Sequence, residues 1–317
     1  MATAATAQSS VPGTAPGPRV TATIPLDRQP LNITTDPVTD MVYVTEPYKL
    51  VVINGRTNLV VTTVPIPSKV FNVATDPRTD MIYVAALGYH PVLAISGRTN
   101  TVVAKIPAGP GPYYIATNPQ THMIYVSTIP TPNRGRIAVI NGRTNKLVTI
   151  IHLANLTNSI ATNPLTNTIY VEGRLPTSGN GIFVINGQTN KVVATIPGID
   201  SAGLATNPLT HTLYAIDPFS EGDGSLFAIN GQTNKLQATV LVGASPLGVA
   251  TDPMTNFVYV ANYDSDTVSV INGRTNSVTA TITVGSHPRS VATDPFTSTV
   301  YVANTSSHSI SVIAGNR

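Results

Sequence analysis

Chemistry at neutral pH would have to come from few side chains, because this 317-residue chain has no cysteine and only 10% charged residues. A histidine or a carboxylate can move a proton when its surroundings tune its pKa. The candidates for such a catalytic role are His287, His90, Glu46 and Glu172. These residues are far apart in the sequence, so they could act together only if the fold assembles them.

Binding of a ligand would depend on a second set of cationic and aromatic side chains. Arg28, Lys69 and Arg289 each come shortly before a short apolar run, and a cluster of such cations would suit an anionic group. Tyr113 and Tyr114 form an aromatic pair that could wall a ligand site or pack in the interior. Further ligand-binding candidates in variable segments are Tyr48, Tyr89, Arg134 and Arg174.

Known catalytic and cofactor motifs are missing from the sequence. The absence of cysteine excludes disulfides and thiolate metal sites. Two acidic segments, "YDSDT" at 263–267 and "DPFSEGDG" at 217–224, could offer oxygen ligands to Ca²⁺, but neither completes a calcium-loop motif. We therefore predict neither a metal nor a cofactor.

The elements that must position these residues follow from an internal repeat. Seven tyrosines recur at spacings of 40, 42, 45, 44, 45 and 42 residues: Tyr43, Tyr83, Tyr125, Tyr170, Tyr214, Tyr259 and Tyr301. Each unit has four short β-branched runs, here called A to D, separated by segments rich in Gly, Pro, Asn and Asp. This pattern predicts an all-β fold, a single seven-bladed β-propeller of four-stranded blades.

Two turn sequences recur in the repeats. In "TDPRTD" the Asp side chain can cap the turn between strands A and B, and the following Pro presets φ. In "INGRTN" at 53–58 we expect Asn-Gly to supply the positive φ of a tight turn between strands C and D.

The last repeat predicts how the ring closes. It ends at "SISVIAGNR" without a fourth strand, whereas "RVTATIP" at 19–25 resembles "SVTATIT" at 277–283, which is a D strand. We expect this N-terminal strand to complete the last blade, so that the propeller spans residues 19–317 and residues 1–18 form a flexible tail rich in Ala, Thr, Ser and Pro.

The two rims of this propeller differ in sequence. The A–B and C–D turns, which share one rim, are nearly uniform, whereas the D–A and B–C loops on the other rim vary. Nine of the fifteen carboxylates fall in or beside the variable loops, and blades 3, 4 and 5 have long B–C loops that could form a lid. We predict that the working face is the variable rim around the central funnel.

The stretch "YVANYDSDTVSVINGRTNSVTATITVGSHPRSVATDP" at 259–295 resembles the repeat of the YVTN-type β-propellers, and the likeness extends over about residues 19–317. The resemblance implies the propeller fold. Members of that family and its neighbours include surface and periplasmic binding proteins, redox-partner subunits and lyases. The metal-binding Glu and His residues of antibiotic-inactivating propeller lyases have no matching positions here.

Composition limits the choice of partners and compartment. The net charge is only +3, which predicts no nucleic-acid binding, and no apolar run is long enough for a membrane span. Residues 1–18 have no positive n-region or apolar h-region, so no signal peptide is expected, and both a cytoplasmic and an exported mature form stay open. We expect a monomer.

The sequence leaves three classes of function open. The first is a ligand- or partner-binding propeller that recognises a small molecule or another macromolecule at the variable rim. The second is a small-molecule enzyme of lyase, cyclase or isomerase type in the same funnel. The third is a structural or surface module.

Overall fold

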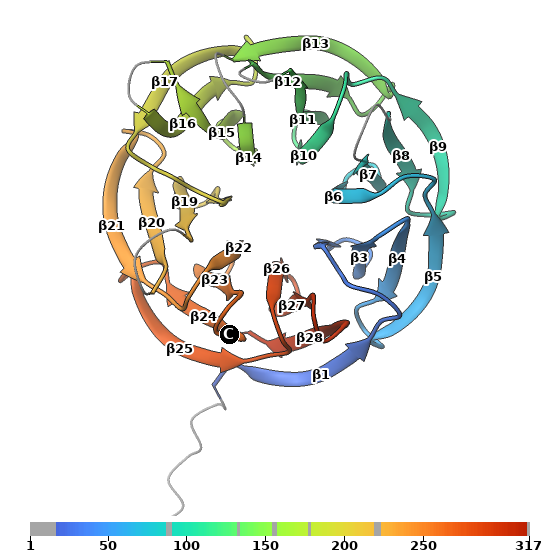
Figure 1. The fold of residues 1–317 in the computed structure, drawn as a ribbon, viewed down its shortest axis with the longest axis vertical. Coiled ribbons are helices and arrows are strands. Elements are labelled where there is room, and N and C mark those ends of the chain that lie inside the picture. Colours follow the sequence, from blue (N-terminus) through green and yellow to red (C-terminus); the bar gives the residue numbers. More distant parts are fainter. Residues whose placement is uncertain are drawn as a thin grey trace, which may run out of the picture.

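The computed structural model describes residues 17–86, 91–131, 134–153, 157–176, 179–218 and 223–315. All regular structure in these ranges is β-strand. The strands form seven four-stranded antiparallel sheets arranged as blades around one axis (Figure 1). The prediction of a seven-bladed propeller is confirmed.

Each blade runs from an inner A strand to an outer D strand, and Figure 1 shows the D strands on the circumference. The A strands are β2 (Asn32–Asp36), β6 (Val70–Asp76), β10 (Pro112–Asn118), β14 (Thr157–Asn163), β18 (Gly203–Asn207), β22 (Pro246–Asp252) and β26 (Pro288–Asp294). The B strands are β3 (Met41–Glu46), β7 (Met81–Ala86), β11 (Met123–Thr131), β15 (Thr168–Leu175), β19 (Thr212–Asp217), β23 (Phe257–Asn262) and β27 (Thr299–Asn304). The C strands are β4 (Lys49–Asn54), β8 (Val92–Ser96), β12 (Arg134–Asn141), β16 (Gly179–Asn186), β20 (Ser225–Asn230), β24 (Thr267–Asn272) and β28 (Ser309–Ala314). The D strands are β5 (Leu59–Pro65), β9 (Thr101–Ile106), β13 (Lys146–Leu153), β17 (Lys191–Pro197), β21 (Lys235–Leu241), β25 (Ser277–Thr283) and β1 (Arg19–Pro25).

The ring closes through its first strand. Strand β1 pairs antiparallel with β28, in a register that places Arg19 opposite Ala314 and Pro25 opposite Ser309. The last blade therefore takes three strands from the end of the described chain and one from its beginning. The predicted closure is confirmed, and it covers the edge of β28, so that the last blade has the same four strands as the other six.

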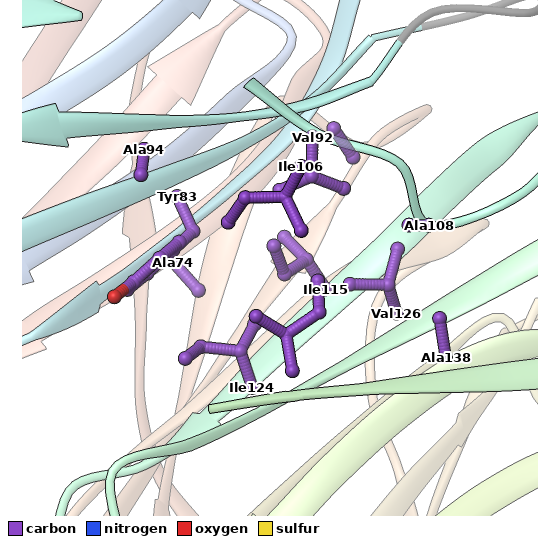
Figure 2. Packing of buried hydrophobic residues seen from close by; sticks show 12 residues of the cluster. Ala74, Tyr83, Val92, Ala94, Ile106, Ala108, Ile115, Ile124, Val126 and Ala138 are labelled. Carbon is purple, nitrogen blue, oxygen red and sulfur yellow. The ribbon is translucent and has the colours of Figure 1, made fainter. Parts of the chain in front are cut away.

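The core lies between adjacent blades. In Figure 2, Tyr83 and Ile106 of blade 2 gather with Ile115 and Val126 of blade 3 in one buried cluster. The B and C strands are buried on both faces, so their sequences are continuous apolar runs of the "MIYVAA" kind rather than alternating ones. Blade-to-blade packing thus fixes how each A strand faces the axis.

The uniform turns are capped by side chains, as expected. Asp36 Oδ1 accepts the backbone N–H of Val38 at 2.9 Å in an A–B turn. Asn54 Oδ1 accepts the N–H groups of Arg56 at 3.0 Å and Thr57 at 3.1 Å in a C–D turn. Burial raises the pKa of the Asp36 carboxyl, although the N–H groups of Val38 and Thr39 pull it down.

The expected role of the Asn-Gly pair in the C–D turns is wrong. The positive φ falls on the last residue of the turn, such as Asn58 at 56°, and Gly55 does not have one. The same left-handed position ends each A–B turn, as in Asp40 at 56°. Gly55 is needed for space instead, since a Cβ there would lie 2.7 Å from Tyr301 Oη and 2.8 Å from the Asp40 carbonyl oxygen.

This steric requirement links neighbouring blades through the seven recurring tyrosines, all of which are buried. Tyr83 Oη donates to the Gly142 carbonyl oxygen of the next blade at 3.1 Å. Tyr301 Oη reaches Gly55 across the closure in the same way, at 3.2 Å. The repeated Tyr and the turn Gly are therefore two halves of one contact between blades.

A ring of threonines links the A strands around the axis. In each blade one Thr hydroxyl donates to the backbone carbonyl of the equivalent Thr in the preceding blade, at 2.5–2.8 Å. The donors are Thr35, Thr75, Thr117, Thr162, Thr206, Thr251 and Thr293. The bond from Thr35 to Thr293 completes the circle, so the inner wall is closed by hydrogen bonds as well as by packing.

Candidate functional site

The axial channel contains two adjoining cavities where the A strands begin. The inner one has a volume of about 170 Å³ and the outer one about 90 Å³, and both are lined by Asn32, Tyr114 and Ser290. All seven positions that start the A strands line the inner cavity: Asn32, Asn72, Tyr114, Ser159, Gly203, Gly248 and Ser290. The cavities open toward the D–A loops, which belong to the variable rim.

The lining offers hydrogen-bonding groups that the protein does not use. The side-chain amides of Asn32 and Asn72 and the hydroxyls of Tyr114 and Ser290 make no hydrogen bond within the described residues. Ser159 Oγ accepts the N–H of Leu204 at 3.1 Å. A polar molecule in the channel would therefore meet unpaired donors and acceptors from four blades.

An aromatic cluster stands at the mouth of the channel. The rings of Phe71 and Tyr113 stack with centroids 3.8 Å apart, and Tyr114 meets Phe71 edge-on at 5.6 Å. Arg289 lies over the Phe71 ring, 5.9 Å from its centroid, and also lines the outer cavity. This contact brings together blades 7 and 2 across blade 1.

Burial governs the ionisation of the two tyrosines. It raises the pKa of Tyr114 to about 12, with smaller contributions from Tyr113 and Glu172, while the Arg289 charge works in the opposite direction. The pKa of Tyr113 is raised for the same main reason. Both hydroxyls are therefore neutral at physiological pH and can donate or accept a hydrogen bond.

The consecutive placement of Phe71 and Asn72 depends on a β-bulge. Strand β6 shifts register against β7 between Val70 and Asn72, and blades 3, 4, 6 and 7 have the same irregularity. A bulge sets two residues opposite one, so neighbours can face the same side. The sequence analysis named Tyr113 and Arg289 but missed Phe71, although Phe71 holds the same place in blade 2, directly before the equivalent A-strand residue.

The predicted cationic cluster does not assemble as a whole. Arg289 lines the outer cavity, but Arg28 and Lys69 are exposed and line neither cavity. His287 also lies outside both cavities: its ring packs against Tyr263 at 4.6 Å, and its backbone N–H donates to Asp266 Oδ1 at 2.7 Å. Arg289 is the one cation that lines the described axial cavities.

Glu46, a catalytic candidate, belongs to a local ion-pair group on the variable rim. Its carboxylate is buried, and Oε2 lies 2.9 Å from Lys49 Nζ. The same ammonium group contacts Asp27 at 3.1 Å. These residues line neither axial cavity. Their ion pairs hold the β3–β4 turn in place.

Glu172 lies nearer the channel. It is buried, and its residue pairs with Ser159 in the register of β14 and β15. Its charge contributes to the raised pKa of Tyr114. Glu172 itself lines neither cavity, but its neighbour Ser159 lines the inner one and Tyr114 lines both, which makes it the carboxylate candidate connected to the axial site.

The other candidates occupy the variable loops. Tyr48 is exposed at 54% and has a left-handed φ of 68°, and Arg174 is exposed near the end of β15. Arg134 starts β12, but its side chain is outside the described part of the structure. Tyr89 and His90 lie outside the described residues altogether.

The long B–C loops of blades 3 and 4 extend the strands. Register continues to Thr131 opposite Arg134 in blade 3 and to Leu175 opposite Gly179 in blade 4. The described residues of these two hairpins line neither axial cavity. The tips of the three long loops, at residues 132–133, 177–178 and 219–222, lie outside the described residues, so the predicted lid stays a prediction.

The acidic segment at 263–267 uses its carboxylates within the protein. Asp264 pairs with the Ser245 hydroxyl, and Asp266 accepts the His287 N–H. Across the described ranges, no three His, Asp or Glu side chains gather closely enough to hold a metal ion. Nor do these ranges contain a helix of the length and apolarity needed to cross a bilayer.

Comparison with known proteins bears on the fold. A family model described as "Lactonase, 7-bladed beta-propeller" matches residues 185–278. The structure of Kuenenia stuttgartiensis hydrazine synthase is similar, with a TM-score of 0.78 at 17% identity, over 96% of this chain and 98% of that chain. No curated protein matches the sequence. The blades described above and these likenesses show that the chain is a seven-bladed β-propeller. Residues 185–278 resemble the lactonase family.

Proposed function

We propose that this protein is a binding propeller that takes a small anionic molecule, such as an organic carboxylate, into its axial cavities from the variable rim. The observation that carries the proposal is Arg289, which stands at the channel mouth without an ion-pair partner among the described residues. A guanidinium group pairs with a carboxylate through charge-assisted hydrogen bonds.

The groups deeper in the channel support this assignment. The free amides of Asn32 and Asn72 and the Tyr114 and Ser290 hydroxyls can bind the remaining oxygens of an acid. The stacked aromatic rings offer an apolar wall beside Arg289. Such a mixture of a few polar groups with an aromatic surface is typical of small-molecule sites.

The volume restricts the size of the ligand. Cavities of about 90 and 170 Å³ are smaller than the roughly 300–1,000 Å³ of sites for drug-sized molecules. We infer a compact ligand with few non-hydrogen atoms. We also propose that the chain is a YVTN-repeat propeller, on the strength of the "YVAN" strands and the "INGRTN" turns.

Calorimetric titration with benzoate and acetate tests the assignment, with benzamide and acetamide as neutral counterparts. We expect the acids to bind and the amides not to bind. Arg289→Gln should weaken acid binding by about 10-fold or more, because a charge-assisted bond contributes about 1.5–3 kcal/mol. Lys69→Gln is the matched control, because it removes an exposed cation from the same rim without touching the cavity. Equal acid binding by wild type and Arg289→Gln would refute the proposal.

A second candidate is an enzyme that acts on a small lactone in the same channel. It is favoured by the partial match to the lactonase family and by the buried Glu172, whose charge is felt at Tyr114. In this case Glu172 would remove a proton from the attacking water while Arg289 stabilises the oxyanion. Hydrolysis of δ-valerolactone, followed by proton release, distinguishes the two candidates. Turnover lost in both Glu172→Gln and Arg289→Gln favours the enzyme, and no turnover above the buffer rate removes it.

A further inference from the structure

The rim opposite the proposed ligand site has an unusual set of exposed apolar side chains. They occupy the third residue of the A–B turns, directly after the Pro. Their exposed fractions are 63% for Val38, 53% for Leu165, 57% for Leu209, 67% for Met254 and 69% for Phe296. Other exposed apolar residues, such as Val61 and Val193, lie on the outer D strands, so these five are set apart by their place on one rim and not by exposure alone.

These five residues come from consecutive blades. Leu165, Leu209, Met254 and Phe296 belong to blades 4 to 7, and Val38 belongs to blade 1, which the closure places next to blade 7. In blades 2 and 3 the same position holds Arg78 and Gln120. Because A–B turns surround the axis, the five side chains follow one another from blade to blade along an arc, here called the turn arc.

Charge on this rim is sorted by burial. Its six carboxylates serve as turn residues: Asp36, Asp40, Asp76, Asp252 and Asp294 are buried, and Asp80 is half-buried. Its exposed cations come from the C–D turns, the ends of the D strands and one A–B turn, and one of them, Arg56, is ion-paired with Asp40. The exposed ones are Arg19, Arg56, Arg78, Arg98, Arg143, Lys146, Lys191, Lys235 and Arg274.

Half of the eighteen Lys and Arg residues of the chain therefore lie exposed on one rim, whereas nine of the fifteen carboxylates lie in the loops of the other. Counted against the six carboxylates of its A–B turns, the nine exposed cations leave this rim with three more cations than carboxylates.

We propose that this rim binds the surface of an anionic lipid bilayer. The turn arc would insert at the boundary between the headgroups and the acyl chains, and the cations around it would contact lipid phosphates. Repeated turns of equal length end at one level, so together they match a planar surface. The arc residues come from separate turn tips and line neither axial cavity, and a further cavity on this rim, of about 180 Å³, is lined by Thr297 and Ser298 but by none of the five. Exposed apolar tips that line none of these cavities favour a bilayer over a protein partner. Basic residues around exposed apolar ones are the composition of interfacial anchors.

Tryptophan fluorescence can test this proposal, because the protein contains no tryptophan of its own. Phe296→Trp places one fluorophore in the turn arc, and Tyr48→Trp places one on the opposite rim at a residue that is 54% exposed. With vesicles of 70% phosphatidylcholine and 30% phosphatidylglycerol, emission from Phe296→Trp should shift to shorter wavelength, and emission from Tyr48→Trp should not. Pure phosphatidylcholine vesicles should give little shift in either variant.

Vesicle co-sedimentation then separates the contribution of the apolar side chains to binding from that of the cations. Met254→Ser combined with Phe296→Ser should weaken binding by about 10-fold or more, and Arg143→Gln combined with Lys146→Gln by about 10-fold, with a strong dependence on salt. Leu241→Ser and Arg28→Gln are matched controls, since they remove an exposed apolar residue and an exposed cation from the other rim. Both should bind like wild type.

Absence of binding to the anionic vesicles would overturn the proposal. Equal blue shifts from both tryptophans, or binding to polyglutamate without binding to vesicles, would do the same, the latter by pointing to an acidic protein. Titration with benzoate reports the axial site independently, so failure of one proposal leaves the other measurable.

Discussion

The two rims of this propeller are built from the same seven repeats and obey different constraints. On the rim of A–B and C–D turns, capping bonds, left-handed residues and the Tyr–Gly contact hold the backbone. The exposed third position of the A–B turns varies most, from Arg78 and Gln120 to Phe296. On the other rim the loops differ in length, and the A-strand bulges set the chemistry of the channel. Turns with the same backbone can therefore expose different side chains, because the residues that hold the backbone and the residue that faces solvent occupy different positions of the turn.

The largest expected effect is alkaline unfolding, which tests how tightly the uniform rim and its tyrosines are packed. Burial raises the pKa of Tyr125, Tyr170 and Tyr301 to about 12, whereas an unfolded chain has tyrosine pKa values near 10. The stability that these residues contribute is intact below pH 10 and is lost as the pH rises toward 12.

Phenolate absorbance and circular dichroism, followed together between pH 9 and 13, measure this transition. We expect the buried phenols to ionise in the same steep step in which the β-signal disappears. Ionisation of most tyrosines near pH 10 with an unchanged β-signal would contradict the packing described here.

Replacing Gly55 by Ala should have the next largest effect. The added Cβ would lie under 3 Å from the Asp40 carbonyl oxygen and from Tyr301 Oη. Overpacking of this kind costs about 2–3 kcal/mol of unfolding free energy. Leu241→Ala, at an exposed site on the variable rim, should change it by less than about 0.5 kcal/mol. Urea denaturation of the two variants compares the rims directly, and equal stabilities would remove the distinction.

Removing a turn cap should cost somewhat less. Asn54→Ala eliminates the acceptor of two backbone N–H groups, and loss of such a cap costs about 1–2 kcal/mol. The counterpart on the variable rim is Asn180→Ala, which breaks one exposed bond to Asp200 and should be nearly neutral. Thermal melts compare the stabilities of the two variants. A larger loss of stability in Asn180→Ala than in Asn54→Ala would contradict the prediction.

The smallest effect should separate two tyrosines of the same rim. Tyr83 Oη donates to Gly142, but Tyr43 Oη is buried without a hydrogen-bond partner among the described residues. Tyr83→Phe should therefore lower the free energy of unfolding by about 0.5–1.5 kcal/mol, and Tyr43→Phe should leave it unchanged or slightly raised. Denaturant titrations resolve the difference. Equal losses would mean that both hydroxyls have similar partners.

Much of the fold could be predicted because it depends on local patterns. Tyrosine spacing located the blades, and the similarity of residues 19–25 to residues 277–283 located the closure. The site was less accessible, because strict alternation of strand faces cannot place Phe71 and Asn72 on one side, whereas a bulge can. The role of Gly55 was misread for a related reason: its constraint comes from Tyr301 of another blade, 246 residues away.

The register of the closing strands has a mechanical consequence. Arg19 lies opposite Ala314, so the two ends of the described ring leave the β1–β28 pair at the same point. A force that pulls these ends apart would load the hydrogen bonds one after another, as in a zipper, and not all at once in shear. The seam that makes the ring continuous at equilibrium is thus its weakest point under tension, and a single peeling strand would open the circle before any blade is torn apart.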